Sequence, residues 1–202
     1  MKKVDHKRVL KEFYKPSSKQ PSEVDVPQMN FLMIDGRGDP NTAQEYQDAM
    51  EALYATSFTL KFKLKKAKIA DYTVMPLEGL WWVEGSEGFD IDSKEMWHWT
   101  SMIMQPQPIS RSDVLEAIPE VKEKKDPVAL RKLRFESYRE GYSVQILHLG
   151  PWSEEKPTID RLHSYAEERG FKLRGKHHEI YLSDPRRTAP EKLKTVIRQP
   201  VA

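Results

Sequence analysis

The tetrapeptides Ile103-Met104-Gln105-Pro106 and Ile197-Arg198-Gln199-Pro200 each close a segment that has the residue pattern of a β-strand. Proline lacks the backbone N–H that a strand needs, so each predicted strand ends at its proline. Four residues can match by chance, but the elements before each tetrapeptide also occur in the same order. The two stretches therefore indicate a duplicated structural unit.

Each unit is predicted to run strand, helix, strand, strand. In the first unit these elements cover residues 29–35, 42–66, 72–83 (broken near Pro76) and 97–105. In the second unit they cover 142–149, a helix that starts at Ser153, a third element of two short strands separated by Gly175 (171–174 and 179–182), and a last strand at 195–199. Thr42 and Glu45 have capping-box spacing, and residues 84–88 are expected to form a hairpin loop. Two helices connect the units, one from Ser110 to an interruption at Pro119 and one from Pro127.

The predicted fold class is α+β: a tandem βαββ repeat with pseudo-twofold symmetry and an antiparallel sheet. Helices would cover one face of this sheet, and the other face would form a ligand groove. The halves would span about 28–108 and 140–202, joined by a helical segment, within a ligand-binding domain of residues 28–202. Residues 1–27 are expected to be an extended lead-in along the domain, because this segment is too short for a three-helix DNA-binding unit.

Composition argues against several classes of protein. The 202 residues contain no cysteine, which excludes disulfides and thiolate metal sites and favours a reducing, cytoplasmic location. No apolar run approaches the ~20 residues that span a bilayer, so neither a membrane span nor a signal peptide is predicted. The net charge of +2, with both signs mixed, argues against nucleic-acid binding through a basic face. A monomer or a homodimer is expected.

The run His177-His178-Glu179-Ile180-Tyr181 is the main candidate site. Side chains alternate along a strand, so His177, Glu179 and Tyr181 share one face. We expect His178 and Ile180 to pack beneath the helices and Glu179 to lie on the open face. A desolvated carboxyl there could hold an organic cation or exchange a proton with a substrate. The alternative is an exposed glutamate in an ordinary cross-strand pair.

Aromatic residues are the second candidate feature. Trp81 and Trp82 are adjacent in a strand and must face opposite sides, whereas Trp97 and Trp99 must face the same side. The candidates for contact with a ligand are Trp82, Trp99, Tyr54, Tyr72, Tyr142 and His177. The alternative is core packing, which is the common place of tryptophan.

No metal or cofactor is predicted. His177 and His178 face apart, and His148 and His163 lack a spacing that pairs them with a carboxylate ligand. Gly36-Arg37-Gly38 lacks the rest of a dinucleotide fingerprint, and the sequence has no serine nucleophile elbow or phosphate loop.

Three segments of the chain resemble the GyrI-like small-molecule-binding family. They are Glu78-Gly79-Leu80-Trp81-Trp82, Gln145-Ile146-Leu147-His148-Leu149-Gly150-Pro151 and His177-His178-Glu179-Ile180-Tyr181-Leu182-Ser183-Asp184-Pro185. The similarity covers about residues 28–201, and it implies a pseudo-twofold pair of βαββ units with a central groove. It also places Glu179 at the position of the family's pocket glutamate. In multidrug-responsive regulators of this kind, that carboxylate contacts cationic aromatic drugs, but the DNA-binding domain of those regulators is not expected here.

The resemblance implies three hypotheses for function, because stand-alone relatives include hydrolases of cyclopropane-containing genotoxins, binders and gyrase inhibitors. In the preferred hypothesis the protein detoxifies such compounds. Glu179 is the general base for a water that opens the strained ring, and Tyr181 steadies the developing negative charge. In the second, the protein binds small cationic or aromatic molecules without turnover, and Glu179 is a counter-ion. In the third, it binds another protein, for example a topoisomerase.

Overall fold

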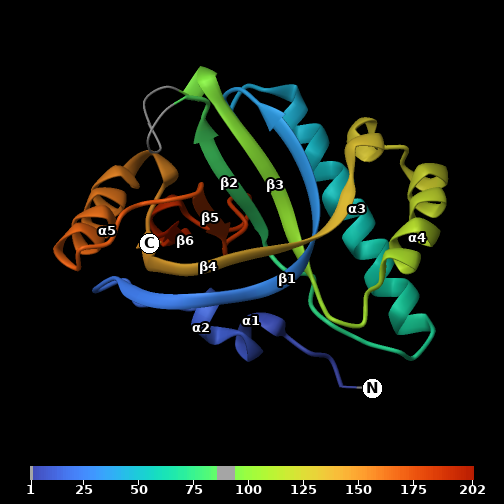
Figure 1. Cartoon of the computed structure of the whole chain (residues 1–202). Coiled ribbons are helices and arrows are strands. Elements are labelled where there is room, and N and C mark those ends of the chain that lie inside the picture. Colours follow the sequence, from blue (N-terminus) through green and yellow to red (C-terminus); the bar gives the residue numbers. More distant parts are fainter. Residues whose placement is uncertain (1, 86–93) are drawn as a thin grey trace.

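Six antiparallel strands form one closed barrel in the order β1-β3-β2-β5-β6-β4. This computed structural model describes residues 2–85 and 94–202 (Figure 1). The strands are β1 (Ser22–Arg37), β2 (Leu77–Val83), β3 (Trp97–Gln105), β4 (Arg134–Leu149), β5 (His177–Tyr181) and β6 (Lys194–Pro200). The α-helices are α1 (His6–Val9), α2 (Lys11–Tyr14), α3 (Gln44–Lys66), α4 (Arg111–Lys124) and α5 (Lys156–Glu168). Short 3-10 helices cover Lys94–Met96, Val128–Lys132, Trp152–Glu154 and Pro190–Lys192.

The barrel is built from two equivalent halves. β1, α3, β2 and β3 form the first βαββ unit, and β4, α5, β5 and β6 form the second. β2 pairs with β5 between the halves, and β1 pairs with β4 where the barrel closes. The two tetrapeptides occupy matching places, since Ile103 lies opposite Leu32 on β1 and Ile197 lies opposite Ile146 on β4. The predicted α+β class and the tandem repeat are confirmed.

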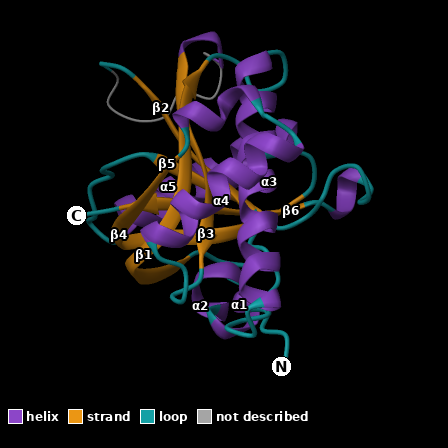
Figure 2. Ribbon diagram, turned by 90° about the vertical axis from the view of Figure 1, so that its right-hand side faces the viewer, coloured by secondary structure: helices purple, strands orange, loops and turns teal. Residues whose placement is uncertain are grey.

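The long helices lie on the outside of the barrel. α3 packs on β1 and β3, and α5 packs on β4 and β6, so the two helices flank the barrel on opposite sides in Figure 1. The side view of Figure 2 shows α3 alongside the strands. Beneath α5, Ile159 and Leu162 pack on Val144, Ile146 and Ile197. None of the described helices has the length and apolar character that crossing a bilayer requires.

The segment before the barrel is partly helical. The predicted lead-in, residues 1–27, contains α1, α2 and the start of β1 at Ser22. Phe13 and Tyr14 of α2 are buried, with 8% and 3% of their surface exposed. The backbone carbonyl of Ser17 accepts a hydrogen bond from the N–H of Leu147 at 3.0 Å. The N-terminal helices are therefore attached to the barrel rather than laid loosely on it.

α4 begins where the sequence predicts, but it does not stop at Pro119. The side chains of Ser110 and Asp113 form a capping box, and the helix runs to Lys124 with Pro119 inside it. Proline removes one hydrogen bond there, while buried Val114 and Val121 hold the turns on both sides against the core.

Other predicted boundaries shift because tertiary contacts override local pattern. α3 begins after Ala43 without a side-chain cap, because the carboxylate of Glu45 accepts from the N–H of Arg37 and pairs with Lys132. The segment after Pro127 forms a 3-10 helix instead of the predicted α-helix, and Ser153 lies in a second 3-10 helix before α5. β2 starts after Pro76, and β4 begins at Arg134, earlier in the chain than the predicted start at residue 142. Of the predicted strand 171–174, one bridge remains, between Leu173 and Val201. The predicted hairpin loop 84–88 lies partly outside the described residues.

Candidate functional site

β5 presents Glu179 to the long helices. Glu179 lies opposite Ile197 of β6, one of the side chains that α5 covers. Next to it, the hydroxyl of Tyr181 lies beside that of Tyr46 of α3. The expectation that Glu179 faces away from the helices is therefore corrected. The opposite face of β5 is directed to the inside of the six-stranded barrel.

The carboxylate of Glu179 is held by its two neighbours on the same face of β5. His177 bonds through Nε2 to Oε1 at 3.1 Å, and the hydroxyl of Tyr181 donates to Oε2 at 2.8 Å. Glu179 has 8% of its surface exposed, and His177 has 1%. These two bonds fix the position of the Glu179 carboxyl in a nearly dry place.

A second carboxyl, that of Glu155, lies beside Glu179. Glu155 directly precedes α5 and is 2% exposed. Burial raises its pKa well above the ordinary value, and the negative charge of Glu179 raises it further. Burial and the charge of Glu179 also raise the pKa values of the Tyr181 and Tyr46 hydroxyls, which stay protonated at neutral pH. We call these five residues (Tyr46, Glu155, His177, Glu179 and Tyr181) the helix-side cluster.

Aromatic rings border the helix-side cluster. The ring of Tyr46 lies 5.8 Å from that of Trp81 and 5.1 Å from that of Trp99, the latter edge-to-face. The Trp81 indole lies over Gly79, the residue opposite Glu179, where a Cβ would come within 2.6 Å of Nε1. On the outer side, Trp152 packs edge-to-face on Tyr181 at 5.6 Å and is 39% exposed.

Five of the residues singled out in the sequence lie in or next to this cluster. His177, Glu179 and Tyr181 are in direct contact, and Trp99 reaches them through Tyr46. Tyr54 lies two turns after Tyr46 on α3, with its hydroxyl beside the backbone of Leu77.

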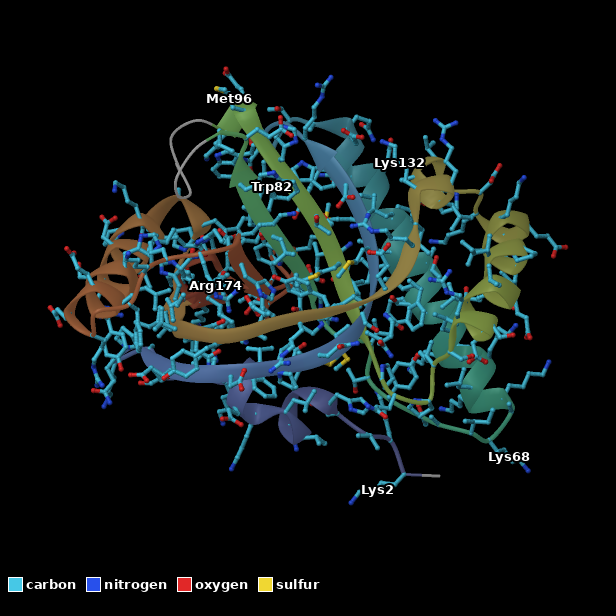
Figure 3. All side chains as sticks on the ribbon, in the orientation of Figure 1. Lys2, Lys68, Trp82, Met96, Lys132 and Arg174 are labelled. Atoms are coloured by element: carbon cyan, nitrogen blue, oxygen red, sulfur yellow. The ribbon has the colours of Figure 1, made fainter. Side chains whose placement is uncertain are left out.

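Three other candidates lie elsewhere. Trp82, labelled on β2 in Figure 3, faces the inside of the barrel, where it stacks on His98 with Nζ of Lys176 3.3 Å from its ring centre. Tyr72 is buried against His6 of α1. Tyr142 is 40% exposed on β4 and donates to Glu23. The alternation of side chains along a strand could not predict the neighbours of these residues, because it gives no information about which strands and helices pack together.

Sequence reasoning did not identify Tyr46 and Glu155 as site residues. Tyr46 fits the apolar spacing of α3 and resembles a core residue, and Glu155 resembles an ordinary acid in the first turn of a helix. Neither signal distinguishes a site residue from a structural one. Only the packing of α3 on β1 and β3, and of α5 on β4 and β6, brings them to Glu179.

The opposite face of β5 carries a different group of charges inside the barrel. His178 bonds through Nδ1 to Glu140 at 2.9 Å and through Nε2 to Glu78 at 3.0 Å. Arg198 donates to Glu140 at 2.9 Å, and the hydroxyl of Tyr14 donates to Glu78 at 2.8 Å. We call Glu78, Glu140, His178 and Arg198 the barrel cluster. His178, expected to pack beneath the helices, is instead a buried partner of two carboxylates.

Glu140 and His178 of the barrel cluster hold their charges in spite of burial. Burial opposes charge on Glu140, but His178 and Arg198 overcome it and lower its pKa to about 2. Burial also opposes charge on His178, yet the carboxylates of Glu140 and Glu78 raise its pKa to about 9. Within residues 2–85 and 94–202, no three His, Asp or Glu side chains are grouped so that they could hold a metal ion.

The chain belongs to the GyrI-like family, because residues 19–202 match the model of the GyrI-like small molecule binding domain. It is similar to an uncharacterised conserved protein from Listeria innocua, at 40% identity and a TM-score of 0.91, over 98% of this chain and 100% of that one. It is also 40% identical to a hydrolase from Listeria innocua, with a TM-score of 0.89 and full coverage of both chains.

More distant structures share the fold alone. The C-terminal domain of EcmrR is 12% identical, with a TM-score of 0.56, over 91% of this chain and 97% of that one. No curated protein matches the chain.

Proposed function

We propose that this chain is a hydrolase that opens electrophilic cyclopropane rings in flat aromatic compounds, with Glu179 as the general base. The observation that carries the proposal is the buried Glu179 carboxylate, which His177 and Tyr181 hold in place beside a second carboxyl. The 40% identity with a hydrolase over the whole chain favours turnover over binding alone. Opening such rings would detoxify genotoxic compounds.

The proposed reaction adds water across one strained bond. Glu179 takes a proton from water as the water oxygen bonds to a ring carbon. One C–C bond of the ring breaks, and its electron pair moves to a conjugated carbonyl oxygen, which is protonated to a hydroxyl. The neutral hydroxyls of Tyr181 and Tyr46 lie beside Glu179 and could donate hydrogen bonds to the oxygen while it carries negative charge.

Trp152 indicates the side from which a substrate would approach. Its ring is the exposed aromatic surface in contact with Tyr181, whereas Trp81 and Trp99 are buried behind the cluster. A flat substrate would stack against or displace the Trp152 ring to reach Glu179, and its aromatic body would exclude water from the carboxylate.

Mass spectrometry of ring-opened product tests the proposal, with purified protein and an aromatic compound whose cyclopropane is conjugated to a carbonyl. Wild type should turn over repeatedly, and Glu179→Gln should lower kcat by about 10²–10⁴-fold because it cannot accept a proton. Glu191→Gln, at an exposed glutamate, is the matched control and should keep the wild-type rate. Wild type that forms no product would refute the hydrolase, and an unchanged rate in Glu179→Gln would refute the role of Glu179.

The second candidate function is binding of cationic aromatic molecules without turnover. The anionic Glu179 with the rings of Tyr46, Tyr181 and Trp152 nearby favours it, since a carboxylate and aromatic faces both attract organic cations. Quenching of tryptophan fluorescence by an aromatic cation, with the compound recovered unchanged, would support this function. Equal affinity for that cation in wild type and Glu179→Gln would count against it.

A further inference from the structure

We infer that Glu155 is a second catalytic residue: it shares one proton with Glu179 and delivers that proton to the oxygen that gains the electron pair of the opened ring. The delivery step rests on the proposed ring-opening activity. The shared proton does not, and it can be observed without a substrate.

The backbone holds Glu155 at the start of α5 and turns its side chain inward. Its carbonyl accepts hydrogen bonds from the N–H groups of Thr158 and Ile159, at 2.8 and 3.0 Å. The residue is 2% exposed, whereas its neighbour Glu154 is exposed. The side chain lies beside Thr195, which is opposite Tyr181 across the β5–β6 pair. α5 therefore holds a carboxyl over the strand that carries Glu179.

Helix capping does not explain this buried acid. The side chain of Glu155 makes no capping hydrogen bond at the start of α5. Oε1 of Glu155 and the hydroxyl of Thr195 beside it are both buried, and neither completes a hydrogen bond in the described part of the chain. A buried polar atom without a partner is rare and costly in native proteins, which points to a role that the fold itself does not supply.

The contact between the two carboxyls requires a proton. The side chains of Glu155 and Glu179 are close enough for the charge of Glu179 to act directly on the Glu155 carboxyl. Two carboxylates cannot bond to each other, but one proton between them makes a strong, charge-assisted hydrogen bond. The carboxyl of Glu179 is bonded to His177 and Tyr181, whereas the Thr195 hydroxyl beside Glu155 completes no hydrogen bond in the described residues. The proton therefore resides on Glu155.

Among the neighbours of Glu155, Glu179 is the charged group that shifts the pKa of Glu155. The titratable groups that face it are Glu179 and Tyr181 of β5, and Tyr46 of α3 lies beyond Tyr181. Burial and the negative charge of Glu179 both raise the pKa of Glu155 well above its usual range. Glu155 is thus an acid that is still protonated where Glu179 is a base.

The pair completes the proton balance of ring opening. As Glu179 takes the proton of the attacking water, Glu155 gives its own to the carbonyl oxygen, so water is added and the cluster keeps its net charge. The proton on Glu179 then passes directly to Glu155, which restores the starting state. Two neighbouring carboxyls that share one proton are suited to these opposite roles.

Carbon-13 NMR of glutamate carboxyls in the full chain tests the shared proton without substrate. In wild type, one carboxyl should remain protonated at neutral pH, and its signal should disappear in Glu155→Gln and persist in the matched control Glu154→Gln. In Glu179→Gln the same signal should titrate at lower pH, because the neighbouring charge is gone. This second variant keeps the test decisive if Glu155→Gln fails to fold. A signal that survives Glu155→Gln, or a Glu155 that is ionised at neutral pH, would overturn the inference.

Rates separate this inference from the proposed function. Glu155→Gln should lower kcat by about 10²–10⁴-fold and lose the fall in rate on the alkaline side of the wild-type pH profile. Glu154→Gln should keep both the rate and the profile. If wild type opens rings and Glu155→Gln is equally fast, the catalytic role of Glu155 fails and the hydrolase stands. If wild type opens no rings but the NMR result holds, the shared proton stands and both the proposed function and the delivery step fail.

Discussion

The two faces of β5 carry two buried groups of acids and bases that are built in opposite ways. In the barrel cluster, the carboxylates of Glu78 and Glu140 face the cations of His178 and Arg198. No buried side-chain atom of those four residues lacks a hydrogen-bond partner in the described part of the chain. In the helix-side cluster, two carboxyls face one histidine and two phenols, and Oε1 of Glu155 has no donor.

This difference separates a structural network from a candidate site. A charge-balanced network with all its hydrogen bonds made can hold four strands in one arrangement. An unbalanced pair of acids lowers stability, and proteins keep such arrangements where they serve a reaction or a ligand. The four predictions below test this contrast.

Breaking the barrel cluster should have the largest effect on stability. Glu140→Gln takes away the carboxylate that pairs with Arg198 and leaves buried His178 with Glu78, so it should lower the free energy of unfolding by about 3–5 kcal/mol. Urea titration of the full chain measures this. Glu136→Gln, at an exposed glutamate of the same strand, is the control and should change stability by at most about 0.5 kcal/mol. Similar losses in both variants would contradict a structural role for the network.

The barrel cluster should also set the pH range of stability. The folded pKa of Glu140 is about 2 instead of 4.5, so its contribution is full above pH 4.5 and is lost as the pH falls toward about 2. The folded pKa of His178 is about 9 instead of 6.5, so its contribution is full below pH 6.5 and is lost as the pH rises through about 9. Unfolding free energies across both windows should show these two slopes in wild type and flatter slopes in Glu140→Gln. Slopes that do not change would mean that other groups set the pH range.

A smaller effect is expected where α2 meets the barrel. Tyr14→Phe removes the hydrogen bond to the buried carboxylate of Glu78 and should cost about 1.5–3 kcal/mol. Tyr181→Phe removes a bond of the same 2.8 Å length to Glu179 but should cost less, because Tyr181 is only half-buried. Urea titration compares the two variants, and a larger loss in Tyr181→Phe would reverse the contrast between the clusters.

The smallest expected change in the free energy of unfolding is an increase, from a substitution of Glu155. The unfolded chain ionises Glu155 above pH 4.5, whereas the folded protein keeps its raised pKa, so Glu155 lowers stability as the pH rises. Glu155→Gln should therefore match wild type in acid and exceed it by up to about 1 kcal/mol at neutral pH. Thermal or urea unfolding at both pH values checks this. A variant less stable than wild type at neutral pH would show that the ionisable carboxyl supports the fold.

Several parts of the fold could be predicted from local pattern. The bounds of β3, Trp97–Gln105, follow from an apolar run that ends at a proline, and α4 begins at a recognisable capping box. The two similar tetrapeptides indicated the repeat, because equivalent strands end in equivalent places. Helix starts such as that of α3 were less predictable, since Glu45 pairs with Lys132, a residue far away in the chain.

The sequence alone determined which side chains of β5 share a face, because a strand alternates with a period of two whatever surrounds it. It therefore grouped His177, Glu179 and Tyr181 correctly and separated them from His178. Closure of the barrel and the packing of α3 and α5 decided which face meets the helices and which meets the interior. The partners of each acid come from segments far apart in the chain, so only the tertiary structure gave Glu140 two cations and left Glu155 beside another carboxyl.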